Sequence, residues 1–398
     1  GHHVPMIVYV PPKWRHLLDM PSGSRGDRLV SFVDLAPTLL SLAGVAIPDR
    51  MQGDAFMGRH KAAPPELQFG FTTNSGKHYV PTRSVFDGRF ILLRSYIPYR
   101  PEALRNFYQW GMPANLAWDD VVLRGECRKD EWLAPFKAHP PERLFDTKAD
   151  PFQISDLADD PGYADVLVRL RAGLSAHLRE TGDLGLFPPS MRNKAPRSLY
   201  AWVHETGFPL DDLIEAAETA SAGDRAKRDI LVSYLTSDSP AFRFWGASGL
   251  ATLAEKSRGG DVPSALLAVM DDEDAYVASE AALAVCYHGR ADLGVPVLMT
   301  LFETRLEKFR ALIAARPEWK GMYYYNDWVA AHSALETLSL DKRFVPEVRK
   351  MIPRLEAIHE GYTRRDQGHR LYARSILVNL GEIPVADLYG LMPRAATK

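Results

Sequence analysis

The chain has 398 residues, 46% of them hydrophobic and 25% charged, so it is long enough to bury a sizeable core in two or three domains. Its net charge of -2 excludes the global positive field that favours nucleic acid. No apolar run reaches about 18 residues, so the sequence predicts no membrane span. Cys127 and Cys286 are expected to be free thiols, because they form neither a disulfide framework nor a metal cluster.

The chain opens on a short apolar run. VPMIVYV at 4–10 is rich in β-branched residues and stops at two prolines, which predicts a buried strand. DLAPTLLSLAG at 34–44 then predicts a helix, and capping explains Asp34 at its start. A strand and a helix of this kind belong to an α/β sandwich. Because the chain lacks the elements that cover such a strand, and lacks a signal peptide, we expect an N-terminal part to be missing.

An antiparallel sheet is predicted next. Its strands are the β-rich runs at 69–73, 79–86 and 89–96, the last two joined by the hairpin signal Asp87-Gly88. An amphipathic helix is predicted at 163–181. The aromatic-rich insertion at 97–141 either packs its rings onto the domain, which we favour, or grips sugar faces.

Several of these stretches carry a family resemblance. They are VPMIV at 4–8, SFVDLAPTLL at 31–40, MQG at 51–53, RSVFDGRF at 83–90 and ERLFDTKADPFQISDLA at 142–158. In this order they resemble the C-terminal third of arylsulfatase-like sulfatases of the alkaline-phosphatase superfamily, over roughly the first half of the chain. The resemblance implies that 1–62 ends the large α/β domain and that 63–182 is a small subdomain, an antiparallel sheet with one packed helix.

The resemblance also implies an activity, the hydrolysis of sulfate esters of a small molecule or saccharide. Sulfatases use calcium and a formylglycine made from the cysteine of Cys-x-Pro-Ser-Arg, a motif that neither Cys127 nor Cys286 matches. Asp146, Lys148 and Asp150 resemble the family's surface turn and not a calcium loop. We therefore expect the catalytic and metal residues to lie upstream, this chain alone to be inactive, and the parent to be periplasmic or secreted.

Four residues are candidates for substrate binding. Lys77 and His78 suit an anionic sulfated sugar and Asn74 suits its hydroxyls, in a loop at 72–78 that the resemblance brings to the cleft edge. The alternative is a solvated turn around Ser75-Gly76. His3 is the fourth candidate, although a hydrogen-bonded structural pair with its neighbour His2 is favoured.

The proline-containing segment 183–209 predicts a linker, and 210–398 predicts an all-α domain. SDSPAFRFWGASGL at 237–250 aligns with DDEDAYVASEAALA at 271–284, with further echoes at 327–338 and 370–380. An acidic turn followed by a helix of small residues is similar to HEAT-type repeats; a non-repetitive helical domain is the alternative. Its expected roles are packing against the sulfatase part, oligomer contact or binding of a protein partner.

Two other functions stay open. A phosphatase or phosphonate hydrolase of the same superfamily shares the α/β core, although DLAPT at 34–38 and LFDTKADP at 144–151 fit sulfatases better. The second is a non-catalytic interaction module of helical repeats with a degenerate enzyme domain. The residues upstream of Gly1 separate the three: Cys-x-Pro-Ser-Arg indicates a sulfatase, Thr or Ser with paired metal sites a phosphatase, and neither indicates a module.

Overall fold

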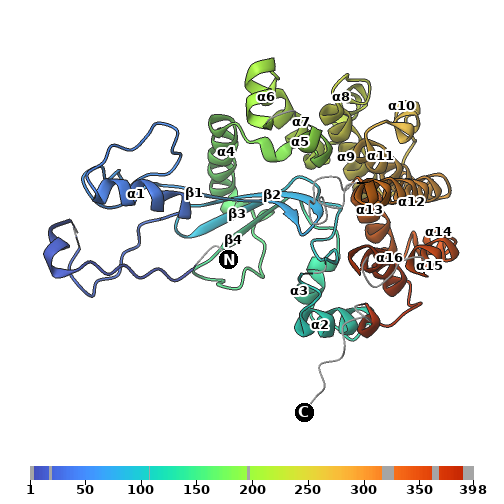
Figure 1. Ribbon diagram of the computed structural model, residues 1–398, viewed down its shortest axis with the longest axis horizontal. Helices are drawn as coiled ribbons and strands as arrows, with labels where there is room; N and C mark the ends of the chain where they lie inside the picture. The colour runs from blue at the N-terminus through green and yellow to red at the C-terminus, as the bar shows by residue number, and fades with distance from the viewer. Residues whose placement is uncertain are drawn as a thin grey trace, which may run out of the picture. The chain divides into compact units, whose positions relative to one another are not determined.

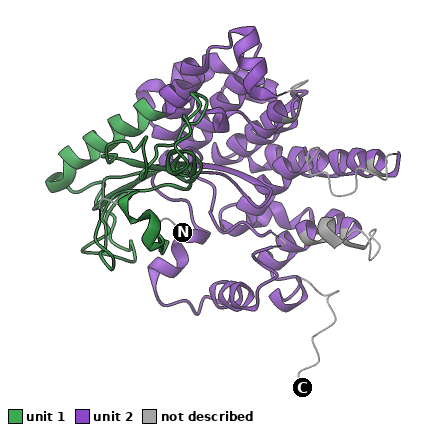
Figure 2. Cartoon of the chain, turned by 60° about the vertical axis from the view of Figure 1, so that its left-hand side comes forward, with its two compact units in different colours: residues 1–71, 83–94, 142–177 green, residues 72–82, 95–141, 178–398 purple. Residues whose placement is uncertain are grey.

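The structure is a computed structural model that describes residues 4–17, 20–106, 108–194, 198–315, 327–360 and 367–388. The chain forms two compact units, shown in different colours in Figure 2. Unit 1 contains residues 1–71, 83–94 and 142–177, and unit 2 contains 72–82, 95–141 and 178–398. These units do not follow the expected boundaries at 62, 182 and 209, because a hairpin tip and the whole aromatic-rich insertion belong with the helices.

The described residues contain the antiparallel sheet that the sequence predicts (Figure 1). The strand order is β1 (Gln68–Ser75), β2 (His78–Phe86), β3 (Phe90–Ser95) and β4 (Glu142–Asp146). β3 pairs antiparallel with β4, with Leu92 opposite Leu144. The expected hairpin joins β2 to β3, but its turn has three residues, 87–89, one more than Asp87-Gly88. The Asp87 carboxylate accepts the N–H groups of Arg89 and Phe90 at 2.9 and 2.7 Å.

Unit 1 also holds most of the predicted amphipathic helix, which is α4 (Ala164–Thr181). Its Leu170 and Leu174 are buried, as the helical periodicity predicts. The ring of His177 stacks on Phe69 of β1 with centroids 3.7 Å apart. Arg171 donates to Glu142 of β4 at 2.6 Å, which joins the polar side of the helix to the edge strand.

The opening stretch differs from its prediction. Residues 4–10 form no strand, and Ile7 and Tyr9 are 93% and 77% exposed. A strand needs a neighbour that accepts and donates its ladder hydrogen bonds, and no described residue pairs with this stretch. The helix that follows is formed as α1 (Leu35–Leu42), and the carboxylate of Asp34 accepts the N–H groups of Ser31 and Asp54, both at 2.8 Å.

Unit 2 is dominated by helices (Figure 1). They are α2 (Pro113–Leu123), α3 (Asp130–Leu133), α5 (Pro189–Lys194), α6 (Leu199–Thr206), α7 (Leu210–Ala222), α8 (Arg228–Tyr234), α9 (Pro240–Ser257), α10 (Ser264–Ala268), α11 (Ala275–Tyr287), α12 (Ala291–Ala315), α13 (Trp328–Leu340), α14 (Val345–Arg349), α15 (Ile352–Glu360) and α16 (Gln367–Asn379). Among the described residues no helix is both long and apolar enough to cross a membrane.

The four stretches with the recurring motif become α9, α11, α13 and α16, and each of these helices packs against the next. Small residues also let α9 lie close to α7 and α8, which contain Ala220 and Leu231 respectively. A Cβ added at Gly249 would lie 2.4 Å from a methyl group of Leu231 and 3.0 Å from the Cα of Ala220. Asp274 caps α11 through the N–H of Tyr276, so the acidic turn has a structural use. The HEAT-like assignment itself stays a prediction.

The segment expected as a linker is helical and partly buried. It contains α5, α6 and the short 3₁₀ helix η5 (Leu184–Leu186). Leu186 and Phe187 are fully buried, and the carbonyl of Leu186 accepts the indole N–H of Trp245 at 3.0 Å. Pro189 begins α5, a position that suits proline because the first turn of a helix needs no N–H donor. The described residues of this segment, 183–194 and 198–209, are therefore a packed part of unit 2, where a linker was expected.

The insertion at 97–141 mainly packs, as we favoured. Trp110 and Phe136 lie in an apolar cluster with Val378, Val385 and Leu388 from the C-terminal part of unit 2. Trp118 packs on Phe136 edge to face, with centroids 5.1 Å apart. Tyr108 and Trp132 remain 70% and 52% exposed, so part of the aromatic surface of the insertion is open to solvent.

Candidate functional site

The tip of the β1–β2 hairpin is where the sequence placed a substrate-binding loop. The strands instead continue to Ser75 and from His78, which leaves a two-residue turn, Gly76-Lys77. Gly76 has φ +60°, and a Cβ there would lie 2.6 Å from the Cβ of Asn106. Only glycine fits this turn without moving Asn106, because it lacks the atom that would collide. The tip is therefore packed against the insertion, within unit 2.

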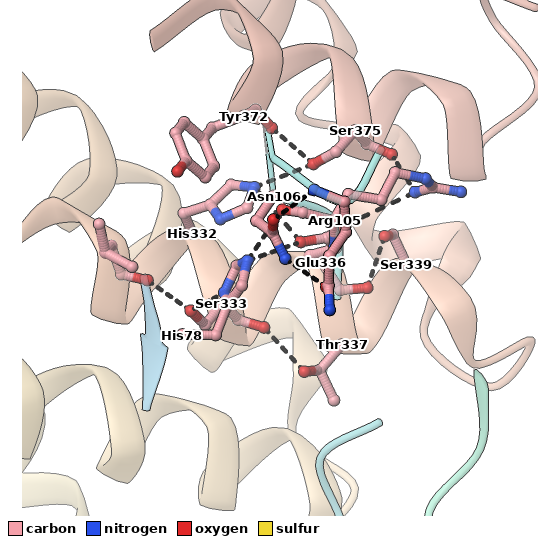
Figure 3. Close-up of polar contacts among 12 residues, drawn as sticks. His78, Arg105, Asn106, His332, Ser333, Glu336, Thr337, Ser339, Tyr372 and Ser375 are labelled. Carbon is pink, nitrogen blue, oxygen red and sulfur yellow. Dashed lines mark hydrogen bonds and ion pairs between the residues drawn. The ribbon is translucent and has the colours of Figure 1, made fainter. Parts of the chain in front are cut away.

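His78 joins this hairpin tip to α13. Its ring is fully buried, with Nδ1 2.7 Å from the hydroxyl of Ser333 and Nε2 2.9 Å from the carbonyl of Arg105 (Figure 3). Burial is the main reason that its pKa falls from 6.5 to about 4. The ring is neutral at neutral pH and has no face open to a saccharide. This differs from the accessible position that the loop prediction gave it.

Helix α13 presents a row of large polar residues to the same place. Trp328, His332 and Glu336 follow one another at four-residue spacing, which puts them on one face of the helix. His332 and Glu336 are both fully buried. One oxygen of Glu336, Oε1, accepts the backbone N–H of Arg105 at 3.0 Å. The other, Oε2, faces two imidazoles: it lies 3.6 Å from Nε2 of His332 and 3.9 Å from Nε2 of His78.

Burial also shifts the pKa values of the ionisable side chains around His78. It raises the pKa of Glu336 to about 7, an effect that nearby Arg105 partly opposes. It lowers the pKa of His332 well below its usual range. It lowers the pKa of Lys77 to about 8. We call His78, His332 and Glu336 the buried triad.

Arg105 connects the insertion to the polar residues of α13 and α16. Its guanidinium binds the carboxylate of Asp119 through Nε and Nη2 at 2.5 and 2.8 Å, and both side chains are buried. Nη1 donates to the carbonyl of Ser375 and to Asn379 on α16, at 3.0 and 2.6 Å. Arg105 thus has an anion for its charge and carbonyl partners for its remaining donors, which a buried guanidinium requires.

A second buried ion pair lies earlier in the insertion. Arg100 donates to Glu280 of α11 at 2.8 Å and to the carbonyl of Tyr79 at 3.0 Å. The hydroxyl of Tyr99 hydrogen-bonds Glu280 and lies 2.9 Å from that of Ser248 on α9. Glu280 of α11 and Glu336 of α13 therefore each bind the first residues of the insertion. Within unit 2, the helical region thus packs against the insertion.

The predicted substrate-binding residues have different surroundings. Asn74 is exposed, and its side-chain amide oxygen Oδ1 accepts a hydrogen bond from the Arg192 guanidinium at 3.3 Å. Lys77 is half-buried, with Nζ 5.2 Å from the ring centre of Trp328 and 5.5 Å from that of Tyr372. His3 lies outside the described residues.

Sequence reasoning missed Arg105, Asp119, His332 and Glu336. For the last two a signal was present, because a histidine and a glutamate at i and i+4 lie on one helix face. Nothing local connects them to His78, which is 255 residues from Ser333 along the chain.

Neither cysteine has the surroundings of a nucleophile. Cys286 is fully buried in α11, and burial raises the pKa of its thiol. Cys127 donates to the carbonyl of Lys129 at 3.6 Å. Within the described ranges, the buried triad is the group of His, Cys, Asp or Glu side chains close enough to hold a metal. Two nitrogen donors and one oxygen do not suit calcium, which prefers six or more oxygen ligands. The residues present therefore do not fit the sulfatase cofactors.

Sequence comparison relates about half of the chain to curated sulfatases. It is 32% identical over 192 residues to an ulvan-active sulfatase from Formosa agariphila, a match covering 48% of this chain and 31% of that protein. A second ulvan-active sulfatase from the same organism is 24% identical over 191 residues, covering 46% of this chain and 34% of its own length. The chain thus spans about a third of the length of the curated relatives it matches. No family model matches it.

Two solved structures are also similar. One is a sulfatase-like protein from Bacteroides thetaiotaomicron and the other is a 2-O GAG sulfatase. Each has a TM-score of 0.25 and 21% sequence identity, over 38% of this chain and 25% of the other. A likeness of this extent does not establish a shared fold.

Proposed function

We propose that this chain is the C-terminal part of a longer sulfatase that hydrolyses sulfate esters of a sulfated saccharide. The observation that carries the proposal is the 32% identity over 192 residues to an ulvan-active sulfatase. The second ulvan-active relative supports the same substrate class. The order of the motifs at 31–40, 83–90 and 142–158 supports the C-terminal position, and ulvan is the first substrate to test.

The exposed apolar residues near the start of the chain also support a longer parent. Ile7 and Tyr9 in the opening stretch, and Phe32 and Leu39 around α1, are each between 67% and 93% exposed. Several large exposed apolar side chains in one region are typical of a surface that another part of a protein covers. We infer that upstream α/β elements of the parent cover them.

The chemistry of sulfate esters indicates which steps we assign to the upstream part and which to this chain. Hydrolysis needs a nucleophile, a cation beside the sulfate oxygens and an acid for the leaving alcohol. We assign formylglycine and calcium to the upstream part. To this chain we assign contact with the saccharide, through Asn74 and Lys77 at the hairpin tip.

The test is to express the longer protein with its upstream residues and measure sulfate released from ulvan. Release that is lost when the upstream formylglycine-forming cysteine becomes alanine supports the proposal, with the present chain as an inactive control. Hydrolysis of phosphate esters without sulfate release would favour the phosphatase alternative. Turnover of neither, in a protein without either nucleophile motif, would favour an interaction module.

The substrate-contact assignment has its own test in the longer protein. Asn74→Ala removes a hydrogen-bonding group worth about 1 kcal/mol, so the KM for the saccharide should rise about fivefold while that for a small aryl sulfate stays unchanged. Lys129→Ala, a change at an exposed position of the insertion, is the control. Equal effects on both substrates would contradict a role in saccharide contact.

A further inference from the structure

Arg192 of α5 is a half-buried arginine whose charge has no carboxylate beside it. Within the described part of the chain, no acidic oxygen lies within 4.0 Å of its guanidinium. The half-buried arginines Arg179, Arg243 and Arg354, by contrast, each pair with a carboxylate. A guanidinium that has lost part of its water shell is stabilised by an anion, so Arg192 is suited to bind an anion that a ligand supplies.

Two contacts hold this guanidinium in place within unit 2. Its Cζ lies 5.5 Å from the ring centre of Tyr79, a buried side chain whose hydroxyl donates to the carbonyl of Gly185 at 3.1 Å. At the surface, Nη2 donates to Oδ1 of Asn74 at 3.3 Å. Nε is enclosed and has no hydrogen-bond partner among the described residues. The guanidinium is therefore oriented before a ligand arrives, and most of its N–H groups are not used by the protein.

The hydrogen bond to Asn74 also decides what this amide offers to a ligand. Because Oδ1 accepts from Arg192, the amide group left for a ligand is Nδ2, which only donates. The guanidinium nitrogens also only donate. N–H groups from two side chains suit the oxygens of a tetrahedral sulfate group, which point in several directions, better than those of a planar carboxylate. Asn74 is exposed, so a saccharide can reach this pair.

We propose that Arg192 and Asn74 form a subsite for a sulfate group of the saccharide other than the one that is hydrolysed. The class of substrate rests on the proposed function, and the subsite adds Arg192 to the contact assigned there to Asn74. The reacting sulfate needs a nucleophile and a cation, which we assign to the upstream part, whereas this pair supplies only N–H donors and a positive charge. The subsite therefore binds and orients the saccharide and takes no part in bond cleavage.

The binding test uses the full chain, with dextran sulfate as the probe and isothermal titration calorimetry as the measurement. Arg192→Gln should weaken binding about tenfold, the lower end for hydrogen bonds to a charged group, because the pair is open to water. Arg192→Lys keeps the charge but loses the fork of donors, so it should restore binding only in part. Arg290→Gln is the matched control, since it removes an exposed arginine that already pairs with Asp292.

Asn74→Asp separates binding from folding. The new carboxylate would pair with Arg192 and present acceptors where the amide presents donors. The melting temperature should therefore hold or rise, while dextran sulfate binding falls at least tenfold. Unchanged binding in both Arg192→Gln and Asn74→Asp would overturn the subsite, and so would an equal loss in Arg290→Gln. Equally tight binding of polygalacturonate, a carboxylated polymer, would overturn its assignment to a sulfate group.

The subsite and the proposed function can fail separately. Sulfate release from ulvan by the longer protein tests the function, and it does not depend on how this chain binds dextran sulfate. Normal release, with binding unchanged by both substitutions, would remove the subsite and keep the sulfatase. Binding that depends on Arg192, in a longer protein that releases no sulfate, would keep the subsite and remove the sulfatase.

Discussion

Arg105 and Asp119 form a two-point ion pair, 2.5 and 2.8 Å long, with both side chains buried. Only 14 residues separate them, yet Arg105 also reaches Asn379 on α16 at 2.6 Å. The pair therefore holds the insertion and α16 in one network.

Asp119→Ala should lower the free energy of unfolding by about 3–5 kcal/mol, because it leaves the Arg105 guanidinium buried without its anion. Chemical denaturation of the full chain measures this. Asp120→Ala is the control: it removes a neighbouring carboxylate whose pair with Arg124 is exposed, and it should cost less than about 1 kcal/mol. Similar costs for the two variants would contradict the buried position of Asp119.

Lys77→Ala should cost about 1–2 kcal/mol of stability, since it removes a half-buried cation over the rings of Trp328 and Tyr372 together with its packed stem. Lys129 gives a close comparison, with its Nζ also 5.2 Å from a tryptophan ring, that of Trp132, but on an exposed surface. Lys129→Ala should cost about 0.5 kcal/mol or less. Thermal unfolding of both variants checks this, and equal losses would mean that burial adds nothing at Lys77.

Asp146→Asn should destabilise unit 1 at neutral pH and have little effect near pH 2. The hydrogen bond from Arg89 is the main reason that the pKa of Asp146 falls from 3.8 to about 2. Between these values the unfolded chain binds more protons than the folded one, so this stabilisation is present above pH 4 and is lost as pH falls to about 2. Unfolding of wild type and variant across this range is the measurement. Asp159→Asn, at an exposed position, should show no such pH-dependent difference.

Gly294→Ala should destabilise the packing of α12 on α11 by about 1–3 kcal/mol. The new Cβ would lie 2.3 Å from the carbonyl oxygen of Ala282, which the helix backbone holds in place. In α4, Gly173→Ala would meet a methyl group of Leu67 at 2.5 Å, and that flexible group can turn away. Gly173→Ala should therefore be close to neutral. Denaturation midpoints of the two variants compare them, and equal midpoints would show that α12 can shift at little cost.

Local signals in the sequence determined the β-hairpin at Asp87-Gly88, the helix at 163–181 and the helix at 34–44. Each depends on contacts between near neighbours, such as the Asp87 carboxylate with the N–H groups that follow it. The strand predicted at 4–10 failed for the opposite reason. Its pattern is that of a strand, but a strand exists only when another strand pairs with it, and no described residue does.

Only the tertiary structure decided whether the β1–β2 hairpin tip is exposed or buried. From sequence, residues 72–78 are a polar stretch with a Ser-Gly turn signal, which is equally consistent with a solvated turn or a binding loop. The structure buries His78 between Ser333 and the carbonyl of Arg105, partners that are 255 and 27 residues away. Burial of this kind depends on which distant helix packs there, and helix periodicity specifies which face is buried without naming what covers it. The buried triad therefore exists only through packing, although two of its members stand four residues apart on one helix.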